Sequence, residues 1–236
     1  MSWKGHSGWV SDVAFVPPTI TATPAPMIVS TANDKSVCIW DLSKSLEHSG
    51  HPVRTFMNRT WHTSGIFSMH TLDDLVMTGS KDGVVRQLQL GSRGMDLVAE
   101  YATHAGVVKC VRVRDAHTYA SCGNDRNIHM VDVRAPESPA VEISGAYKSV
   151  INSLEWCPWD ANLLVSASFD PDLLLHDVRR VSKPVKVLRG HLAGSRSKRI
   201  QSPRFVGTRD RPHVIIPSED GLVLYDVVTG DILSKG

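Results

Sequence analysis

A segment of about 45 residues recurs five times along this chain of 236 residues. Each copy contains a run of β-branched and aliphatic residues, a short polar turn and a second such run. The first copy reads IVSTANDKSVCIWDL from Ile28 to Leu42, and the position of its Trp40 is held in the later copies by Leu88, Val131, His176 and Tyr225. A repeat of this period restricts the fold to architectures built from stacked modules.

The recurring runs have the composition of β-strands. They are short, rich in Val, Ile, Leu and Thr, and separated by Gly, Asn, Asp and Pro. A unit of about 45 residues has room for four such strands. The sequence therefore predicts an all-β protein with five four-stranded modules.

Four polar positions also recur and fit a structural role. In the first copy they are His6, Ser30 and Asp34, together with Trp40. Such side chains can satisfy one another in a buried hydrogen-bonded chain, because each supplies a donor or acceptor that the next one needs. The later copies hold His62, Thr78, Asp82, His104, Ser121, Asp125, Ser166 and Asp170. In the fourth copy, Tyr147 takes the histidine position and His176 takes the tryptophan position.

The Gly-His pair before the first strand and the Trp-Asp pair at the end of the third resemble the marks of the WD-repeat family. The resemblance covers residues 1–236 and implies a β-propeller with repeats at about 5–42, 61–90, 103–134, 146–179 and 190–227. Segments 1–4 and 232–235 would both be outer strands of a blade. We therefore expect the sequence to be an incomplete part of a larger ring of about seven blades, with a closed five-blade ring as the alternative.

Motifs and composition favour a binding protein over an enzyme. The chain lacks the G-x-S-x-G, phosphate-loop and H-E-x-x-H patterns, so we expect neither catalysis nor a metal or cofactor. The four cysteines are scattered without a C-x-x-C pair, and no apolar stretch is long enough for a membrane span. The expected location is intracellular, in the cytoplasm, the nucleus or both.

The expected function is that of a scaffold that binds other proteins or peptides. In a WD-repeat propeller the loops before each first strand and the turns before each third strand share one face. The residues that the register places on this loop face are Trp9, Ser11, Asn33, Phe67, Lys81, Val107, Lys109, Asn124, Val150, Asn152, Phe169, Arg199 and Gln201. The aromatic ones are the strongest candidates, because aromatic side chains often anchor protein partners.

Two alternatives remain open. Asp132-Val133-Arg134 and Asp177-Val178-Arg179 resemble the adaptor-binding box of WD-repeat substrate receptors in cullin–RING ubiquitin ligases. Surface ion pairs would explain the same residues.

The segment from Arg180 to Arg211 has ten basic residues and one acid, although the net charge of the chain is only +2. Arg196, Lys198, Arg199, Arg209 and Arg211 could therefore contact phosphates of nucleic acid or chromatin, or an acidic partner. A solvated loop is the favoured interpretation of this segment.

Overall fold

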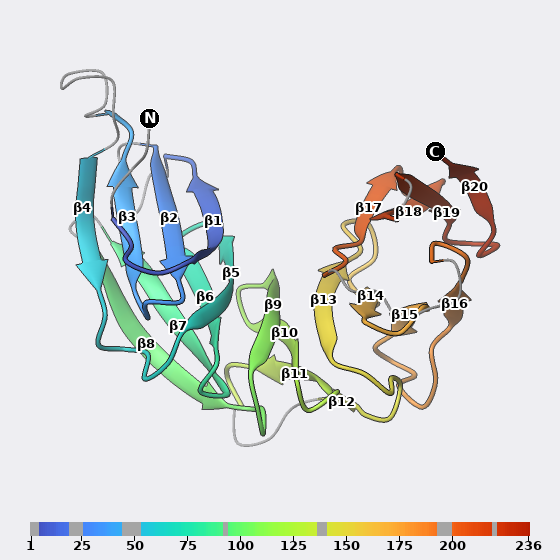
Figure 1. Ribbon diagram of the computed structural model, residues 1–236, viewed down its shortest axis with the longest axis horizontal. Helices are drawn as coiled ribbons and strands as arrows, with labels where there is room; N and C mark the ends of the chain where they lie inside the picture. Colours follow the sequence, from blue (N-terminus) through green and yellow to red (C-terminus); the bar gives the residue numbers. More distant parts are fainter. Residues whose placement is uncertain are drawn as a thin grey trace. The chain divides into compact units, whose positions relative to one another are not determined.

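The computed structural model describes residues 5–18, 26–43, 53–91, 94–135, 141–192, 200–218 and 221–236. It divides into two compact units, Met1–Ala116 and His117–Gly236, which are described separately (Figure 1). Within these ranges the chain forms twenty β-strands in five four-stranded antiparallel sheets, as the sequence predicts. The strand orders are β1-β2-β3-β4, β5-β6-β7-β8, β12-β11-β10-β9, β13-β14-β15-β16 and β17-β18-β19-β20. Consecutive strands are neighbours throughout, which is the topology of a propeller blade.

The first unit holds two complete sheets and one further strand (Figure 1). The first sheet consists of β1 (Val10–Val16), β2 (Met27–Ala32), β3 (Val37–Asp41) and β4 (Val53–Asn58). The second consists of β5 (Ile66–Leu72), β6 (Leu75–Ser80), β7 (Val84–Gly91) and β8 (Gly94–Ala102). The remaining strand is β9 (Val108–Asp115).

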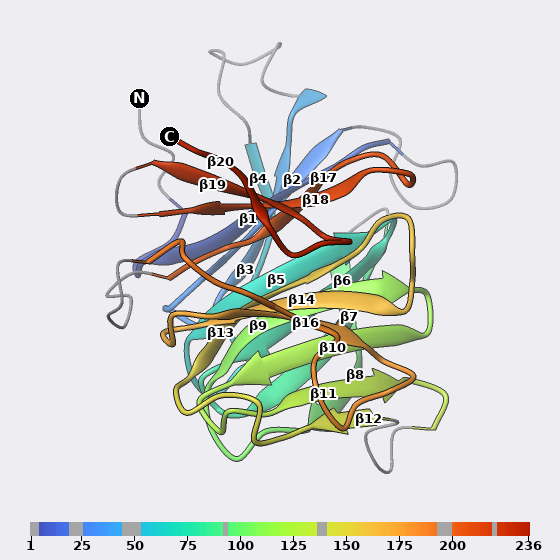
Figure 2. The ribbon, with the colours of Figure 1, turned by 90° about the vertical axis from the view of Figure 1, so that its right-hand side faces the viewer.

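The second unit begins with β10 (Thr118–Gly123), β11 (Ile128–Asp132) and β12 (Val141–Ile143). Its next sheet consists of β13 (Ile151–Trp156), β14 (Leu163–Ser168), β15 (Leu173–Asp177) and β16 (Lys186–Leu188). The last consists of β17 (Arg204–Gly207), β18 (Pro212–Pro217), β19 (Leu222–Asp226) and β20 (Ile232–Lys235), shown in red in Figure 2.

The turn between the second and third strands has the same backbone form in the first three sheets. The residue after the turn aspartate has a positive φ, with values of 70° at Lys35, 83° at Gly83 and 68° at Arg126. This left-handed conformation reverses the chain within a few residues. The fourth copy has Pro171 at this place, and proline cannot adopt a positive φ, so its turn differs.

Each unit has its own apolar core between sheets. In the first, Val29 and Ile39 pack with Ile66, Met69 and Leu88. In the second, one cluster contains Val165, Leu175, Val214, Val223 and Tyr225. The positions equivalent to Trp40 thus remain in the core when they become Leu88 or Tyr225, because burial there requires bulk rather than indole.

In the first unit, side chains of one inner strand bind the backbone of the next. The Asp12 carboxylate on β1 accepts a hydrogen bond from the Met69 backbone N–H on β5 at 3.0 Å. On β5, Ser68 Oγ accepts the Val111 N–H and His70 Nδ1 accepts the Val113 N–H of β9, both at 3.1 Å. These contacts satisfy backbone donors that an edge strand would otherwise leave unpaired.

The described cysteines Cys38, Cys110, Cys122 and Cys157 are all free and buried. Within the described ranges, no helix has the length and apolar character needed to cross a bilayer.

Candidate functional site

A surface cluster of the first unit joins three residues predicted for the loop face. The rings of Trp9 and Phe67 pack edge to face with centroids 5.9 Å apart. The Lys109 ammonium lies 4.2 Å from the centroid of Phe67, within cation–π distance. Trp9 is 59% exposed, whereas Phe67 and Lys109 are half-buried. The three residues precede β1 or lie near the starts of β5 and β9, so consecutive inner strands bring them together.

Backbone hydrogen bonds place two further predicted residues beside this cluster. The Asn33 N–H donates to the carbonyl of Trp9, and the Lys81 N–H donates to the carbonyl of Gly65, both at 2.8 Å. A Cβ built on Gly65 would lie 2.5 Å from Nδ2 of Asn33, so the missing side chain makes room for this amide. The turn after β2 is therefore bound to the backbone of Trp9, and the turn after β6 is bound to the backbone just before Phe67 on β5.

The cluster is positively charged. Burial lowers the pKa of Lys109, and the positive charge of Lys81 lowers it further. Among the residues that the structure describes, neither lysine forms an ion pair with a carboxylate. The two ammonium groups therefore repel each other.

The other residues predicted for the loop face lie in varied surroundings. Asn33, Lys81 and Asn124 are exposed, while Ser11, Val107, Val150 and Phe169 are half-buried. Ser11 Oγ lies 3.1 Å from Thr31 Oγ1, so its hydroxyl is engaged within the first sheet. Arg199 lies outside the described residues.

Two members of the predicted set were wrongly placed at the surface. Gln201 is only 3% exposed, and its amide oxygen accepts a hydrogen bond from His191 Nε2 at 3.0 Å. Asn152 on β13 is 5% exposed. Register alone could not distinguish these buried side chains from those that point outward.

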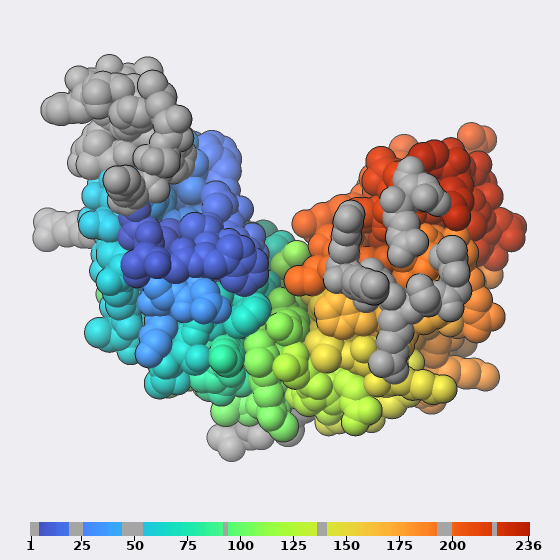
Figure 3. Space-filling model, viewed as in Figure 1, coloured from blue at the N-terminus to red at the C-terminus, as the bar shows by residue number. Residues whose placement is uncertain are grey.

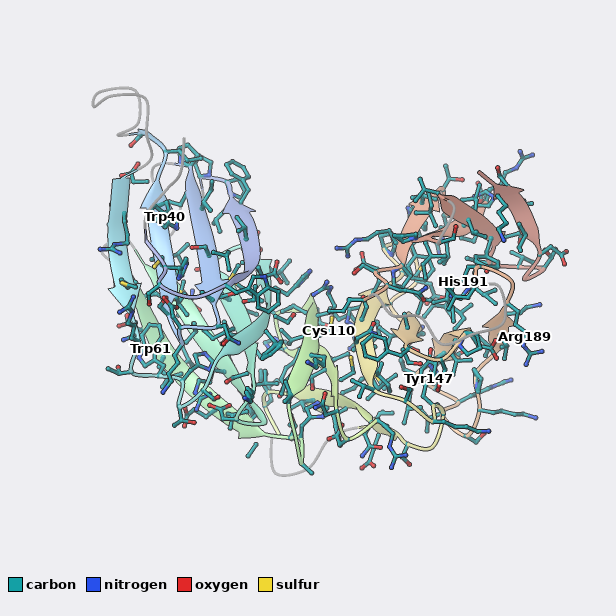
Figure 4. The ribbon with its side chains drawn as sticks, in the orientation of Figure 1. Trp40, Trp61, Cys110, Tyr147, Arg189 and His191 are labelled. Atoms are coloured by element: carbon teal, nitrogen blue, oxygen red, sulfur yellow. The ribbon has the colours of Figure 1, made fainter. Side chains whose placement is uncertain are left out.

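The four polar positions of the first copy form a continuous chain. Trp40 Nε1 donates to Ser30 Oγ at 2.8 Å, and Ser30 Oγ lies 2.7 Å from His6 Nε2. On the other ring edge, His6 Nδ1 lies 2.6 Å from Ser36 Oγ, whose hydroxyl donates to Asp34. Burial acts to raise the pKa of Asp34, but hydrogen bonds from Ser36 and Ser7 outweigh it and lower the pKa well below its usual range. Figure 4 marks Trp40 within this sheet.

In the second sheet a buried arginine, Arg86 on β7, completes the chain. Its guanidinium donates to His62 Nδ1 at 2.9 Å and to both carboxylate oxygens of Asp82, and it also contacts Glu100. His62 Nε2 then donates to Thr78 Oγ1 at 2.9 Å. Arg86 was not among the residues predicted from the sequence. The signal available was a charged residue at the register of Cys38, two residues before the tryptophan position.

The third copy keeps His104 and Ser121 buried, and Val131 fills the tryptophan position with an apolar side chain. Its Asp125 accepts the Asn127 N–H at 3.2 Å, which closes the turn.

Tyr147 replaces histidine in the fourth copy and keeps the network intact. Its hydroxyl donates to the Ser166 carbonyl at 2.7 Å, and His176 Nε2 lies 2.8 Å from Ser166 Oγ. Asp170 instead accepts the Lys148 and Ser149 N–H groups at 2.8 and 3.0 Å. Burial lowers the pKa of His176 to about 4, so this imidazole is neutral at pH 7. Figure 4 marks Tyr147 and, in the fifth copy, His191, whose Nδ1 lies 3.1 Å from the Tyr225 hydroxyl.

The two Asp-Val-Arg sequences form ion pairs within themselves. Arg134 Nε and Nη2 donate to the two carboxylate oxygens of Asp132 at 2.9 and 2.6 Å. Arg179 binds Asp177 in the same way, at 2.9 and 2.7 Å. Hydrogen bonds from these arginines lower the pKa of each aspartate, to about 2 for Asp177. Both arginines are exposed, so the pairs are available at the surface.

The basic segment is described only in part. Arg209 and Arg211 are exposed in the turn between β17 and β18, whereas Arg196, Lys198 and Arg199 lie outside the described residues. Binding of nucleic acid through this segment stays a prediction.

Comparison with known proteins supports the same fold. The family model described as "WD domain, G-beta repeat" matches residues 1–41. The chain is 24% identical over 175 residues to WD-40 repeat-containing protein MSI4 of Arabidopsis thaliana, which covers 71% of the chain and 31% of that protein. It is 26% identical over 167 residues to DDB1- and CUL4-associated factor 13 of Xenopus laevis, covering 70% of the chain and 36% of the relative.

A further relative is Histone acetyltransferase type B subunit 2 of Eremothecium gossypii, 25% identical over 170 residues, covering 70% of the chain and 38% of the relative. The chain therefore spans about a third of the length of these curated relatives. The five sheets share one strand order, and the first carries the complete His-Ser-Asp-Trp chain within the matched residues. The chain is therefore similar to WD-repeat proteins in the sequence of its first repeat and in the strand order of its sheets.

Proposed function

We propose that this chain is a non-catalytic scaffold that binds a partner protein through the surface formed by Trp9, Phe67, Lys81 and Lys109. WD-repeat proteins are in general non-catalytic scaffolds, and the recurring polar side chains of this chain are engaged in its own hydrogen-bonded networks. The four free, buried cysteines fit a reducing intracellular compartment.

The observation that carries the proposal is the exposure of Trp9. An indole that is 59% exposed leaves a large apolar area in water, although its edge contact with Phe67 holds it in place. Tryptophan held in this way loses little conformational entropy on binding and is enriched among residues that dominate binding energy. The start of the chain's first strand, in dark blue, lies at the surface in Figure 3.

Affinity capture followed by mass spectrometry tests this function. We expect wild-type protein to retain partners that a Trp9→Ala, Phe67→Ala double variant loses. Phe15→Ala is the matched control, because Phe15 is an equally exposed aromatic residue of β1, at 58%. If the double variant folds with an unchanged melting temperature and captures the same proteins as the wild type, this surface is not the binding site.

A second candidate function is that of a substrate receptor in a cullin–RING ubiquitin ligase. It is favoured by the two exposed Asp-Val-Arg pairs and by the similarity to a protein named DDB1- and CUL4-associated factor 13. An Arg134→Ala, Arg179→Ala double variant should then lose co-purification with the ligase adaptor while the Trp9 surface still captures its partner. If the wild type brings down no adaptor, this role is excluded.

A further inference from the structure

The Trp9 surface combines an apolar platform with two lysine side chains. Lys109 is held over the Phe67 ring at 4.2 Å, so its ammonium is fixed beside the aromatic pair instead of sampling solvent. Lys81 adds a second positive charge that acts on Lys109. In the described part of the chain, no carboxylate pairs with either group. An incoming anion would relieve their mutual repulsion.

The apolar half of the surface lies next to this charge. The edge-to-face contact, with an interplanar angle of 69°, directs one ring against the other and leaves much of the Trp9 indole in solvent. An aliphatic or aromatic side chain that covered the indole would remove apolar area from water. A ligand that satisfies both halves therefore carries a carboxylate and an apolar side chain close together.

The geometry favours a peptide over a nucleic acid. Stacking of successive bases needs several open aromatic faces, but Lys109 covers one face of Phe67, so Trp9 offers most of the open aromatic surface here. Nucleic-acid affinity also depends on neutralising several phosphates, whereas this surface offers two lysines.

We propose that the partner segment recognised here is acidic: a peptide whose Asp or Glu carboxylate binds between Lys81 and Lys109 while a neighbouring apolar side chain packs on Trp9. This inference rests on the proposed function and specifies the chemistry of its partner.

Selection from a phage-displayed library of random dodecapeptides tests the inference with the full chain. We expect selected peptides to be enriched in Asp or Glu next to a large apolar residue. A Lys81→Gln, Lys109→Gln double variant should bind a selected peptide at least about tenfold more weakly in fluorescence anisotropy, and rising ionic strength should weaken only wild-type binding strongly. Lys183→Gln, which changes an exposed lysine of the second unit, is the matched control and should change affinity less than about twofold.

The outcomes separate this inference from the proposed function. Peptides that require Trp9 and Phe67 but show no acidic enrichment would overturn the inference and leave the binding surface standing. Peptides that bind the Trp9→Ala, Phe67→Ala variant as well as the wild type would overturn both. If an oligo-dT strand displaces the peptides at equal or lower concentration, the surface binds nucleic acid and the proposal of a peptide ligand is wrong.

Discussion

The guanidinium of Arg86 lies 2.9 Å from Nδ1 of His62, and both groups are buried. A guanidinium can only donate, so His62 must accept at Nδ1 and carry its proton on Nε2, which faces Thr78. Arg86 thus does in the second sheet what Ser36 does in the first, connecting the imidazole to the turn aspartate. The recurring network tolerates this exchange because only the order of donors and acceptors has to be preserved.

Replacing Arg86 with methionine should lower the free energy of unfolding by about 3–5 kcal/mol, because the mostly buried Asp82 carboxylate loses its cationic partner and His62 Nδ1 loses its donor. Urea denaturation measures the change. Arg59→Met is the control: Arg59 pairs with Asp34 at 3.3 Å but its side chain is 49% exposed, so we expect a loss below about 1 kcal/mol. Equal losses in both variants would show that Arg86 does not stabilise the network.

Ser30 is the central member of the first chain, and its removal should affect two neighbours. Ser30→Ala leaves Trp40 Nε1 and His6 Nε2 without their partner, at a cost of about 1–3 kcal/mol. Trp40→Phe removes the indole donor and also part of a buried ring, so the cavity adds to the lost hydrogen bond and we expect a loss at least as large as that of Ser30→Ala. Differential scanning calorimetry of both variants provides the comparison. A neutral Ser30→Ala would contradict the proposed bonding.

The buried histidines should make stability fall in acid. Burial, followed by the charge of Arg86, lowers the pKa of His62 to about 3, and burial lowers that of His176 to about 4. The unfolded chain, with an ordinary pKa near 6.5, therefore binds more protons than the folded chain between about pH 6.5 and pH 4. The stabilising contribution is fully present above about pH 6.5 and is lost as the pH falls through this window.

Unfolding free energies measured from pH 7 to pH 4 test this dependence. His176→Gln keeps an N–H donor toward Ser166 but cannot be protonated in this range, so the pH slope should become shallower. An unchanged slope would mean that His176 does not contribute to it.

The side-chain contacts between inner strands predict specific changes in amide exchange. Asp12→Ala should speed hydrogen exchange at the Met69 amide, and Ser68→Ala should do so at the Val111 amide. Asp12→Asn keeps an acceptor oxygen and serves as the control, with exchange close to that of the wild type. NMR-detected exchange resolves the two amides. Acceleration spread evenly over β5 would point to a general loss of stability instead.

Much of the fold could be predicted from sequence because the repeat multiplies a weak signal. A single degenerate copy, such as the third with Val131 in place of tryptophan, predicts its strands weakly. Five copies aligned in register predict the positions of the strands and of the turns between them. The His6–Ser30–Trp40 connection followed from the same reasoning, since buried donors need acceptors.

The remaining features depend on neighbours that the register does not identify. Gln201 was expected on the surface, but its amide turns inward because His191 Nε2 needs an acceptor. Arg86 was overlooked because charged residues in strands usually face solvent, and only its contacts with His62 and Asp82 show why it is buried. Trp9, Phe67 and Lys109 were each proposed singly, whereas their mutual packing is a tertiary property.

The hydrogen bonds between β1, β5 and β9 all have the same polarity along the chain: the accepting side chain comes first and the donating backbone follows. The chain therefore places the strand that carries the acceptors ahead of the strand that carries the donors, so during synthesis on the ribosome β5 and β9 each emerge after the side chains that bind their backbone.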